Sequence, residues 1–409
     1  MASDKLYKLA FEYKKTKLWK KLWDNEIFAV KFSDGEIGYV SIMGKGGTYT
    51  AVAVYVGARA FQTYREIQEG EKLFDSYFKE REHLTCQNCL QLAFENKEEL
   101  RDVELKEARE YAKRYGIRFA GKNSYPQFLN YVPCRFPWNT FSEKEEMYLE
   151  ETLEATIEIA GQLNRKTAQE LGIREISGET RQVICFEKSG NKYRTAMEEL
   201  PLARKKQFLK PEPLDDFTLA SLKRIKKKEV FECELVYLPE PVQNLPDEQP
   251  FFPLMLMMVS KKDGLILPIN IVKSYEENLG NLLRYMAESL KNLGRRPGKL
   301  LVRDERTFAF LDEFGRQMQA EVRIESSLPE LDEAQESMIE EFWVDEDIEG
   351  NVSDFLQILD AMEGMPDEVL CTMPDEMLEQ LEFMADSHML PPDLLRRVED
   401  ILDRMKEEF

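Results

Sequence analysis

The chain has 409 residues, of which 43% are hydrophobic and 33% are charged, a composition typical of globular proteins that excludes a wholly disordered chain. Its longest apolar run, residues 251–259, is broken by Pro253 and is much shorter than the ~20 residues that cross a bilayer, so we expect no membrane partner. Residues 1–8 carry charges but no apolar core of a signal peptide. Six cysteines are too few for a disulfide scaffold, and together these features predict a cytoplasmic protein.

The net charge of −21 is concentrated towards the C-terminus. Residues 329–409 hold 26 Asp and Glu against 4 Lys and Arg, so the rest of the chain is close to neutral. Met-Pro-Asp-Glu recurs at residues 365–368 and 373–376, and proline followed by acids suits the first turn of a helix. We therefore expect residues 345–409 to form an acidic, Met-rich helical tail. It is predicted either to cap the body or to dock an unknown protein partner, and its charge argues against nucleic-acid binding by the intact protein.

Residues 1–200 are predicted to form an α/β domain. Apolar periodicity and Gly-rich turns give a basic amphipathic helix, three strands and further helices. Pro126, Pro133 and Pro137 favour a rigid loop for an aromatic stretch, and Ser142 with Glu145 has the pattern of a capping box. The predicted elements are helix 5–22, strands 27–32, 37–43 and 49–56, helix 58–68, a helical pattern over 71–114 with a possible strand at 89–94, loop 125–141 and helix 142–163.

A second α/β domain with a mixed sheet is predicted over residues 229–344. Residues 201–228 before it are expected to be a basic linker, because they contain three prolines and end in the basic run 223–228. The order of elements in the domain is β-β-β-α-β-α-β-α, and such alternation favours helical crossovers between parallel strands. The predicted elements are strands 230–238, 254–259 and 265–272, helix 275–293, strand 299–303, helix 306–318, strand 321–325 and helix 331–342.

This order of elements resembles that of ribonuclease H-like domains, including the integrase cores of transposases. The resemblance implies that acids from the first strand, the end of the fourth strand and the last helix hold two divalent metals. The acids at those positions are Glu234, Asp304, and Asp332 or Glu333, with Mg²⁺ or Mn²⁺ expected on Glu234 and Asp304. Acids are frequent in this chain, and Asp304 could equally begin a helix. A degenerate domain kept for binding, with no cofactor, therefore remains open.

Two stretches also resemble bacterial proteins whose domains are described only as being of unknown function. The resemblance covers most of residues 5–342, implies a two-part arrangement and brings no activity or cofactor with it. The first stretch includes Leu6-Tyr-Lys-Leu-Ala, Glu36-Ile-Gly-Tyr-Val and Phe136-Pro-Trp, and the second includes Val230-Phe-Glu-Cys-Glu, Val302-Arg-Asp-Glu and Leu328-Pro-Glu-Leu-Asp.

A cysteine motif at residues 83–89 has the spacing of metal ligands. His83, Cys86 and Cys89 could bind Zn²⁺, because Cys-x-x-Cys can hold the metal through two thiolates. A structural zinc site needs four ligands, and Cys134 is the nearest candidate for the fourth. The alternative is a set of ordinary buried thiols.

Three functions stay open at this point, and the sequence does not decide whether the protein is an enzyme. The first choice is a non-catalytic interaction or regulatory protein that uses its acidic tail. The alternatives are a metal-dependent nuclease or transposase-derived enzyme, and a small-ligand sensor with a pocket between the two domains.

Overall fold

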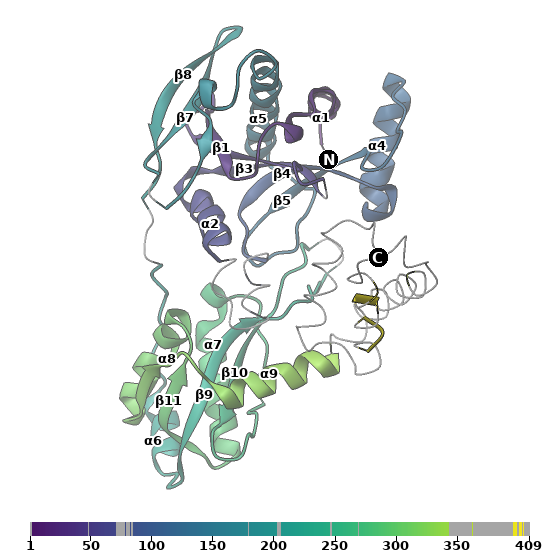
Figure 1. Cartoon of the computed structure of the whole chain (residues 1–409). Helices are drawn as coiled ribbons and strands as arrows, with labels where there is room; N and C mark the ends of the chain where they lie inside the picture. The colour runs from purple at the N-terminus through teal and green to yellow at the C-terminus, as the bar shows by residue number, and fades with distance from the viewer. Residues whose placement is uncertain are drawn as a thin grey trace. The chain divides into compact units, whose positions relative to one another are not determined.

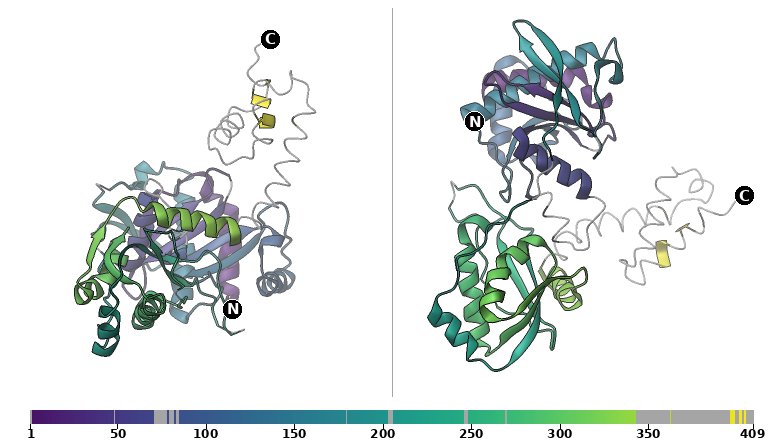
Figure 2. Two further views of the ribbon diagram at one scale, coloured as in Figure 1. Left: turned by 90° about the horizontal axis from the view of Figure 1, so that it is seen from below. Right: turned by 90° about the vertical axis from the view of Figure 1, so that its left-hand side faces the viewer.

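The structure is a computed structural model. It describes residues 2–342 apart from 48, 71–77, 79–81, 83–84, 179, 203–205, 246–247 and 269, and beyond them residues 362, 396–398, 401–402 and 404. The chain divides into two compact units, Met1–Leu331 and Asp332–Phe409. The first unit contains two mixed sheets with their helices (Figures 1 and 2), so the predicted α/β class is confirmed. The predicted acidic tail, 345–409, lies almost wholly outside the described residues.

The larger sheet has eight strands, in the order β5-β4-β3-β2-β1-β7-β8, with β6 paired to β1 outside this path. All its pairs are antiparallel except β1 with β7, which run parallel. The apolar runs and Gly-rich turns of the sequence account for the first three strands. The strands are β1 (Glu26–Lys31), β2 (Ile37–Met43), β3 (Thr50–Val56), β4 (Cys89–Glu95), β5 (Tyr125–Tyr131), β6 (Arg174–Glu175), β7 (Gln182–Ser189) and β8 (Lys192–Glu199).

Helices cover both faces of this sheet, because its strands alternate between two apolar cores. Phe28 and Val30 of β1 belong to the core formed with α1 (Asp4–Thr16), α4 (Asp102–Tyr115) and α5 (Glu143–Gln162). Ile27 and Ala29 belong to the opposite core, formed with α2 (Gly57–Gly70). The sheet is therefore buried on both sides.

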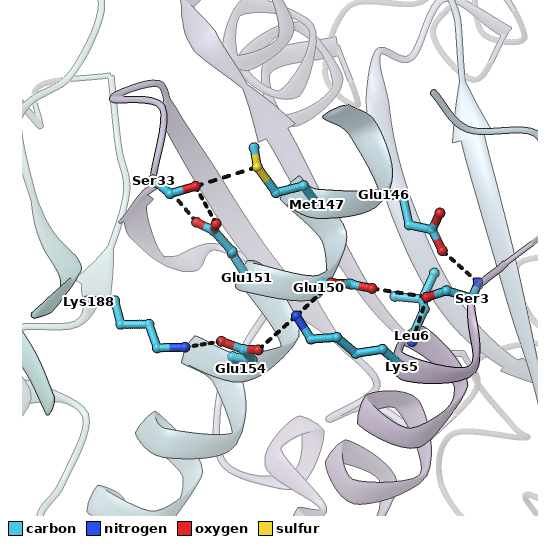
Figure 3. Close-up of polar contacts among 10 residues, drawn as sticks. All are labelled: Ser3, Lys5, Leu6, Ser33, Glu146, Met147, Glu150, Glu151, Glu154 and Lys188. Atoms are coloured by element: carbon cyan, nitrogen blue, oxygen red, sulfur yellow. Dashed lines mark hydrogen bonds and ion pairs between the residues drawn. The ribbon is translucent and has the colours of Figure 1, made fainter. Parts of the chain in front are cut away.

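Glutamates along one face of α5 tie this helix to the start of the chain (Figure 3). Glu146 accepts a hydrogen bond of 2.6 Å from the backbone N–H of Ser3, and Glu150 accepts one of 3.0 Å from its hydroxyl. The Nζ of Lys5 lies 2.7 Å from Glu150 and 3.2 Å from Glu154. The spacing of four residues places all three acids on one side of the helix. This row of carboxylates therefore holds α1 on α5.

The smaller sheet has the order β10-β9-β11-β12. β10 is antiparallel to β9, whereas β11 is parallel to both β9 and β12. Residues 265–272, predicted as a strand, make only isolated bridges with β10. The elements are α6 (Asp216–Lys223), β9 (Lys228–Tyr237), β10 (Leu254–Ser260), α7 (Tyr275–Asn292), β11 (Arg296–Val302), α8 (Glu305–Met318), β12 (Glu321–Ile324) and α9 (Pro329–Phe342).

Four further local features differ from the predictions. The first helix ends at Thr16, because Lys17 adopts a left-handed conformation with φ 53°, and a short 3₁₀ turn, Leu18–Lys20, follows. The aromatic segment expected to be a loop begins with strand β5. The hairpin of β7 and β8 was not predicted. The segment predicted as a basic linker contains α6, whose Leu219 and Leu222 are buried in the core of the smaller sheet.

Candidate functional site

Glu232 and Glu234 of β9 are buried and already have partners. Phe231, Cys233 and Leu235 alternate with them and face the apolar core. Glu232 accepts hydrogen bonds from Lys261 Nζ at 2.6 Å and from the backbone N–H groups at the start of α9 at 2.9 and 3.0 Å. Glu234 lies 3.3 Å from Arg303 Nε. Burial of a carboxylate is costly unless a charge or N–H group compensates, and both glutamates have such compensation.

Asp304, the second predicted metal ligand, is the N-cap of α8. Its carboxylate accepts a hydrogen bond of 2.7 Å from the backbone N–H of Thr307, which satisfies an N–H group that has no partner within the helix. Asp332 is half-buried and Glu333 is exposed on α9, in the second compact unit. Within the described part of the chain, no three His, Cys, Asp or Glu side chains form a group that could hold a metal ion.

The predicted zinc ligands have different surroundings. His83 lies outside the described residues. Cys89 is buried in β4, within the core that α2 covers, and burial raises the pKa of its thiol to about 12. The Sγ of Cys86 instead lies 3.3 Å from the Sγ of Cys134, 48 residues further along the chain. The structure thus brings Cys86 next to the residue named as a fourth ligand.

A cavity of about 510 Å³ lies within the first compact unit, with Cys86 and Cys134 in its wall. One side is a face of α2, since Ala58, Gln62 and Glu66 follow at helical spacing. This volume is in the range of small-molecule sites in proteins. The charged, thiol and aromatic side chains that line the cavity are Arg59, Glu66, Glu82, Lys206, Glu276 and Arg306, Cys86 and Cys134, and Phe208, Tyr237 and Tyr275.

Arg306, on the first turn of α8, is the buried charge of this cavity. Its side chain is 9% exposed, and its two terminal nitrogens donate to the carboxylate of Glu82 at 2.6 and 2.9 Å. One of them also donates to the carbonyl of Leu235 at 2.5 Å, and the guanidinium lies over the ring of Tyr237. The buried Nε of Arg306 has no hydrogen-bond partner among the described residues. An unsatisfied buried donor of this kind costs about 1–3 kcal/mol.

Cys134 occupies a strained position at the cavity. The backbone N–H of Arg135 donates to the carbonyl of Val132 at 3.0 Å, which closes a turn with Pro133 and Cys134 in its centre. Cys134 has φ 60°, a conformation that glycine adopts freely and that costs other residues about 1–2 kcal/mol. Two backbone hydrogen bonds hold this strained residue, one from its own N–H to Thr85 and one from the N–H of Phe252 to its carbonyl. Such strain tends to persist at functional positions.

The two thiols differ in acidity. The hydrogen bond between the Sγ atoms of Cys86 and Cys134 lowers the pKa of Cys134, and the hydroxyl of Tyr237 and the charge of Arg306 act in the same direction, whereas burial and the charge of Glu82 oppose them. The same hydrogen bond and burial raise the pKa of Cys86. When one thiol of the pair ionises, the other S–H can donate to it across the 3.3 Å contact. Burial raises the pKa of Tyr275, also in the wall, to about 12, so its hydroxyl remains a donor, here to the carbonyl of Leu209.

Sequence reasoning did not identify Arg306, Glu82 or Tyr237. Arg306 and Glu82 lie 224 positions apart, and no short motif joins them. The sequence feature that could have pointed to this site is the turn Val132-Pro133-Cys134-Arg135, in which a cysteine occupies the position where glycine is usual.

Two family models match the chain. One, described as Domain of unknown function (DUF7309), matches residues 4–177, and the other, Domain of unknown function (DUF6930), matches residues 218–339. The two-part arrangement implied by the resemblance is thus confirmed. No curated protein matches the chain. Among the described helices, none is long and apolar enough to cross a membrane.

Proposed function

We propose that this protein, which combines the domains DUF7309 and DUF6930, is a regulatory protein that senses a small anionic molecule in the cavity at Arg306. The observation that carries the proposal is a cavity of about 510 Å³ whose wall contains the buried guanidinium of Arg306 and the exposed side chain of Arg59. Ligand sites combine an apolar wall with a few polar groups in this way.

The first turn of α2 supports an anionic ligand. Ala58 and Arg59 line the cavity, and the first N–H groups of a helix have no partners within it and carry a partial positive charge. Arg59 is exposed and forms no ion pair within the described residues. The other exposed cation of the wall, Lys206, is paired with Glu66 at 2.7 Å. Arg59 is therefore the charge available to a carboxylate or phosphate, while Tyr237 and Phe208 offer an apolar wall.

The ribonuclease H-like layout of the second domain is part of this proposal. It is supported by the pairing of β9, antiparallel to β10 and parallel to β11, and by the helices that separate the later strands. The contacts of Glu234 with Arg303 and of Asp304 with Thr307 favour a domain used for binding over a metal-dependent nuclease. Residues 345–409 would then pass the signal to a protein partner, which their concentrated negative charge supports.

The experiment is a thermal-shift screen of the full chain against nucleotides, sugar phosphates and dicarboxylic acids, followed by calorimetry of each compound that stabilises it. We expect Arg59→Gln to weaken binding about tenfold or more, because a hydrogen bond to a charged group contributes about 1.5–3 kcal/mol. Arg109→Gln, at an exposed position on α4, is the matched control and should bind as the wild type does. A ligand whose affinity is the same in all three proteins would contradict the proposed site.

A further inference from the structure

The sulfur atoms of Cys86 and Cys134 form a preorganised pair. They lie 3.3 Å apart, and the hydrogen bond of 2.8 Å from the N–H of Cys134 to the carbonyl of Thr85 joins the two backbone segments beside them. Cys86 is further held by its own N–H, which donates to the carbonyl of Glu82 at 2.8 Å. Because both backbones are held by hydrogen bonds, the short approach of the sulfurs is part of the local fold.

The pair also has the chemical asymmetry of an attacking and a resolving thiol. The pKa of Cys134 is lowered and that of Cys86 is raised, and their sulfurs share a hydrogen bond of 3.3 Å. The thiolate is the reactive form of cysteine, and redox-active cysteines typically stand beside a positive charge and a second thiol. Arg306 supplies the charge, and both cysteines are among the residues that line the cavity, through which a small oxidant would reach them.

The other described cysteines lack these features. Cys89, Cys185 and Cys233 are buried in apolar cores, and burial raises the pKa of each thiol. In a peroxide experiment these three cysteines therefore serve as internal controls that should keep their free thiols. The sixth cysteine, Cys371, lies outside the described residues.

We propose that Cys86 and Cys134 are a redox-sensitive dithiol that a peroxide converts into a disulfide. The thiolate of Cys134 attacks one peroxide oxygen, the O–O bond breaks, and hydroxide leaves to form a sulfenic acid. The sulfur of Cys86 then attacks the sulfenic sulfur of Cys134, the S–O bond breaks, and water leaves with the Cys86 proton. In total, two thiols are oxidised and one hydrogen peroxide is reduced to two waters. This modification does not depend on the proposed ligand.

The disulfide would change the cavity wall. Bonded sulfurs lie about 2.0 Å apart, so the two sulfur atoms must approach each other by about an ångström, through side-chain rotation and movement of the segments that carry them. Cys86 is adjacent to the backbone that carries Glu82, the partner of Arg306, and the carbonyl of Cys134 accepts from Phe252. Oxidation would therefore be transmitted to the buried ion pair and to the segment before β10.

The test treats the reduced full chain with hydrogen peroxide, blocks the remaining thiols with N-ethylmaleimide, and maps digested peptides by mass spectrometry with and without dithiothreitol. We expect the loss of two free thiols and one reducible cross-linked peptide that joins the Cys86 and Cys134 segments. Cys86 and Cys89 fall in the same tryptic peptide, so Cys89→Ser serves as the control that should still form the cross-link. Cys86→Ser should lose it and leave a Cys134 sulfenic acid that dimedone traps.

The pH dependence of Cys134 alkylation supplies a second readout. Alkylation of Cys134 by iodoacetamide should reach half of its maximal rate below pH 9.0, the ordinary thiol value, because its pKa is lowered. Wild-type protein that retains both free thiols after peroxide treatment, or that forms a cross-link with any other cysteine instead, would overturn the proposal. Retention of both free thiols is readable in the wild type alone, even where a variant fails to fold.

Discussion

The carboxylate of Asp304 accepts a hydrogen bond from the backbone N–H of Thr307 at the start of α8. An aspartate at an N-cap satisfies one N–H group and interacts favourably with the helix dipole. The same aspartate stands where the ribonuclease H-like resemblance implies a metal ligand. An aspartate that caps a helix can be replaced by serine, whereas an aspartate that binds a metal ion cannot. Substitutions at Asp304 therefore distinguish the two roles.

Asp304→Ala is expected to lower the free energy of unfolding by about 1 kcal/mol, because the cap of α8 is lost. Asp304→Ser should recover most of this loss, since serine caps helices about as well as aspartate. Urea denaturation measures both variants, and calorimetry with Mg²⁺ accompanies it. Mg²⁺ binding by the wild type that disappears in both variants, with Asp304→Ser as stable as the wild type, would show that the carboxylate is a ligand.

At the scale of residues, sequence analysis placed the side chains of β9 on the correct faces of the strand but could not identify their partners. Alternation along β9 placed Glu232 and Glu234 on the face opposite Phe231, which is correct, and required a solvent or charged partner for them. The partners, Lys261 and Arg303, lie on other elements and could not be assigned from spacing. The Cys86–Cys134 contact could not be predicted from the sequence either. It depends on how the turn after β5 packs against the segment before β4.

At the scale of elements, helix α9 begins at a buried carboxylate of strand β9, that of Glu232. Glu232, which is 0% exposed, accepts from the N–H groups of Glu330 and Leu331 and also binds Lys261. Pro329 at the first helical position fits this arrangement, since proline has no N–H to satisfy. One side chain therefore fixes where the helix starts.

Glu232→Ala is expected to lower the free energy of unfolding by about 3 kcal/mol, because it leaves two N–H groups of α9 and the ammonium of Lys261 without their acceptor. Glu333→Ala, at an exposed position on the same helix, is the matched control and should change it by less than about 0.5 kcal/mol. Chemical denaturation of both variants checks this. Equal stability of the two would mean that the start of α9 does not depend on Glu232.

Elements with strong local signals were predicted well, and the others were not. Apolar runs bounded by Gly-rich turns predicted β1, β2 and β3, and the capping box of Ser142 and Glu145 predicted the start of α5. β5 was missed because it contains Pro126, which suggests a loop. β5 lies at an edge of its sheet, beside β4, and proline is tolerated at such an edge. The exposed polar residues of β8 likewise give little apolar alternation.

For the whole molecule, the cavity at Arg306 is the feature that local patterns could not reveal. Its wall collects residues from α2, from the turn after β5, from the end of β9 and from α8. The sequence supported a ligand pocket only as one of three alternatives, because it contains no motif that indicates a binding site for a small molecule. Its charge, thiols and aromatic rings come from positions that only the tertiary fold brings together.

The most direct test of the proposed function fills the cavity. Gln62 lines it from α2, so Gln62→Trp should place an indole in the ligand's space, whereas Gln68→Trp puts the same side chain on α2 outside the lining residues. The measurement is a calorimetric titration of the best ligand from the screen into both variants. The cavity account predicts that binding is lost in Gln62→Trp and retained in Gln68→Trp. Binding of wild-type strength in a folded Gln62→Trp protein would contradict it.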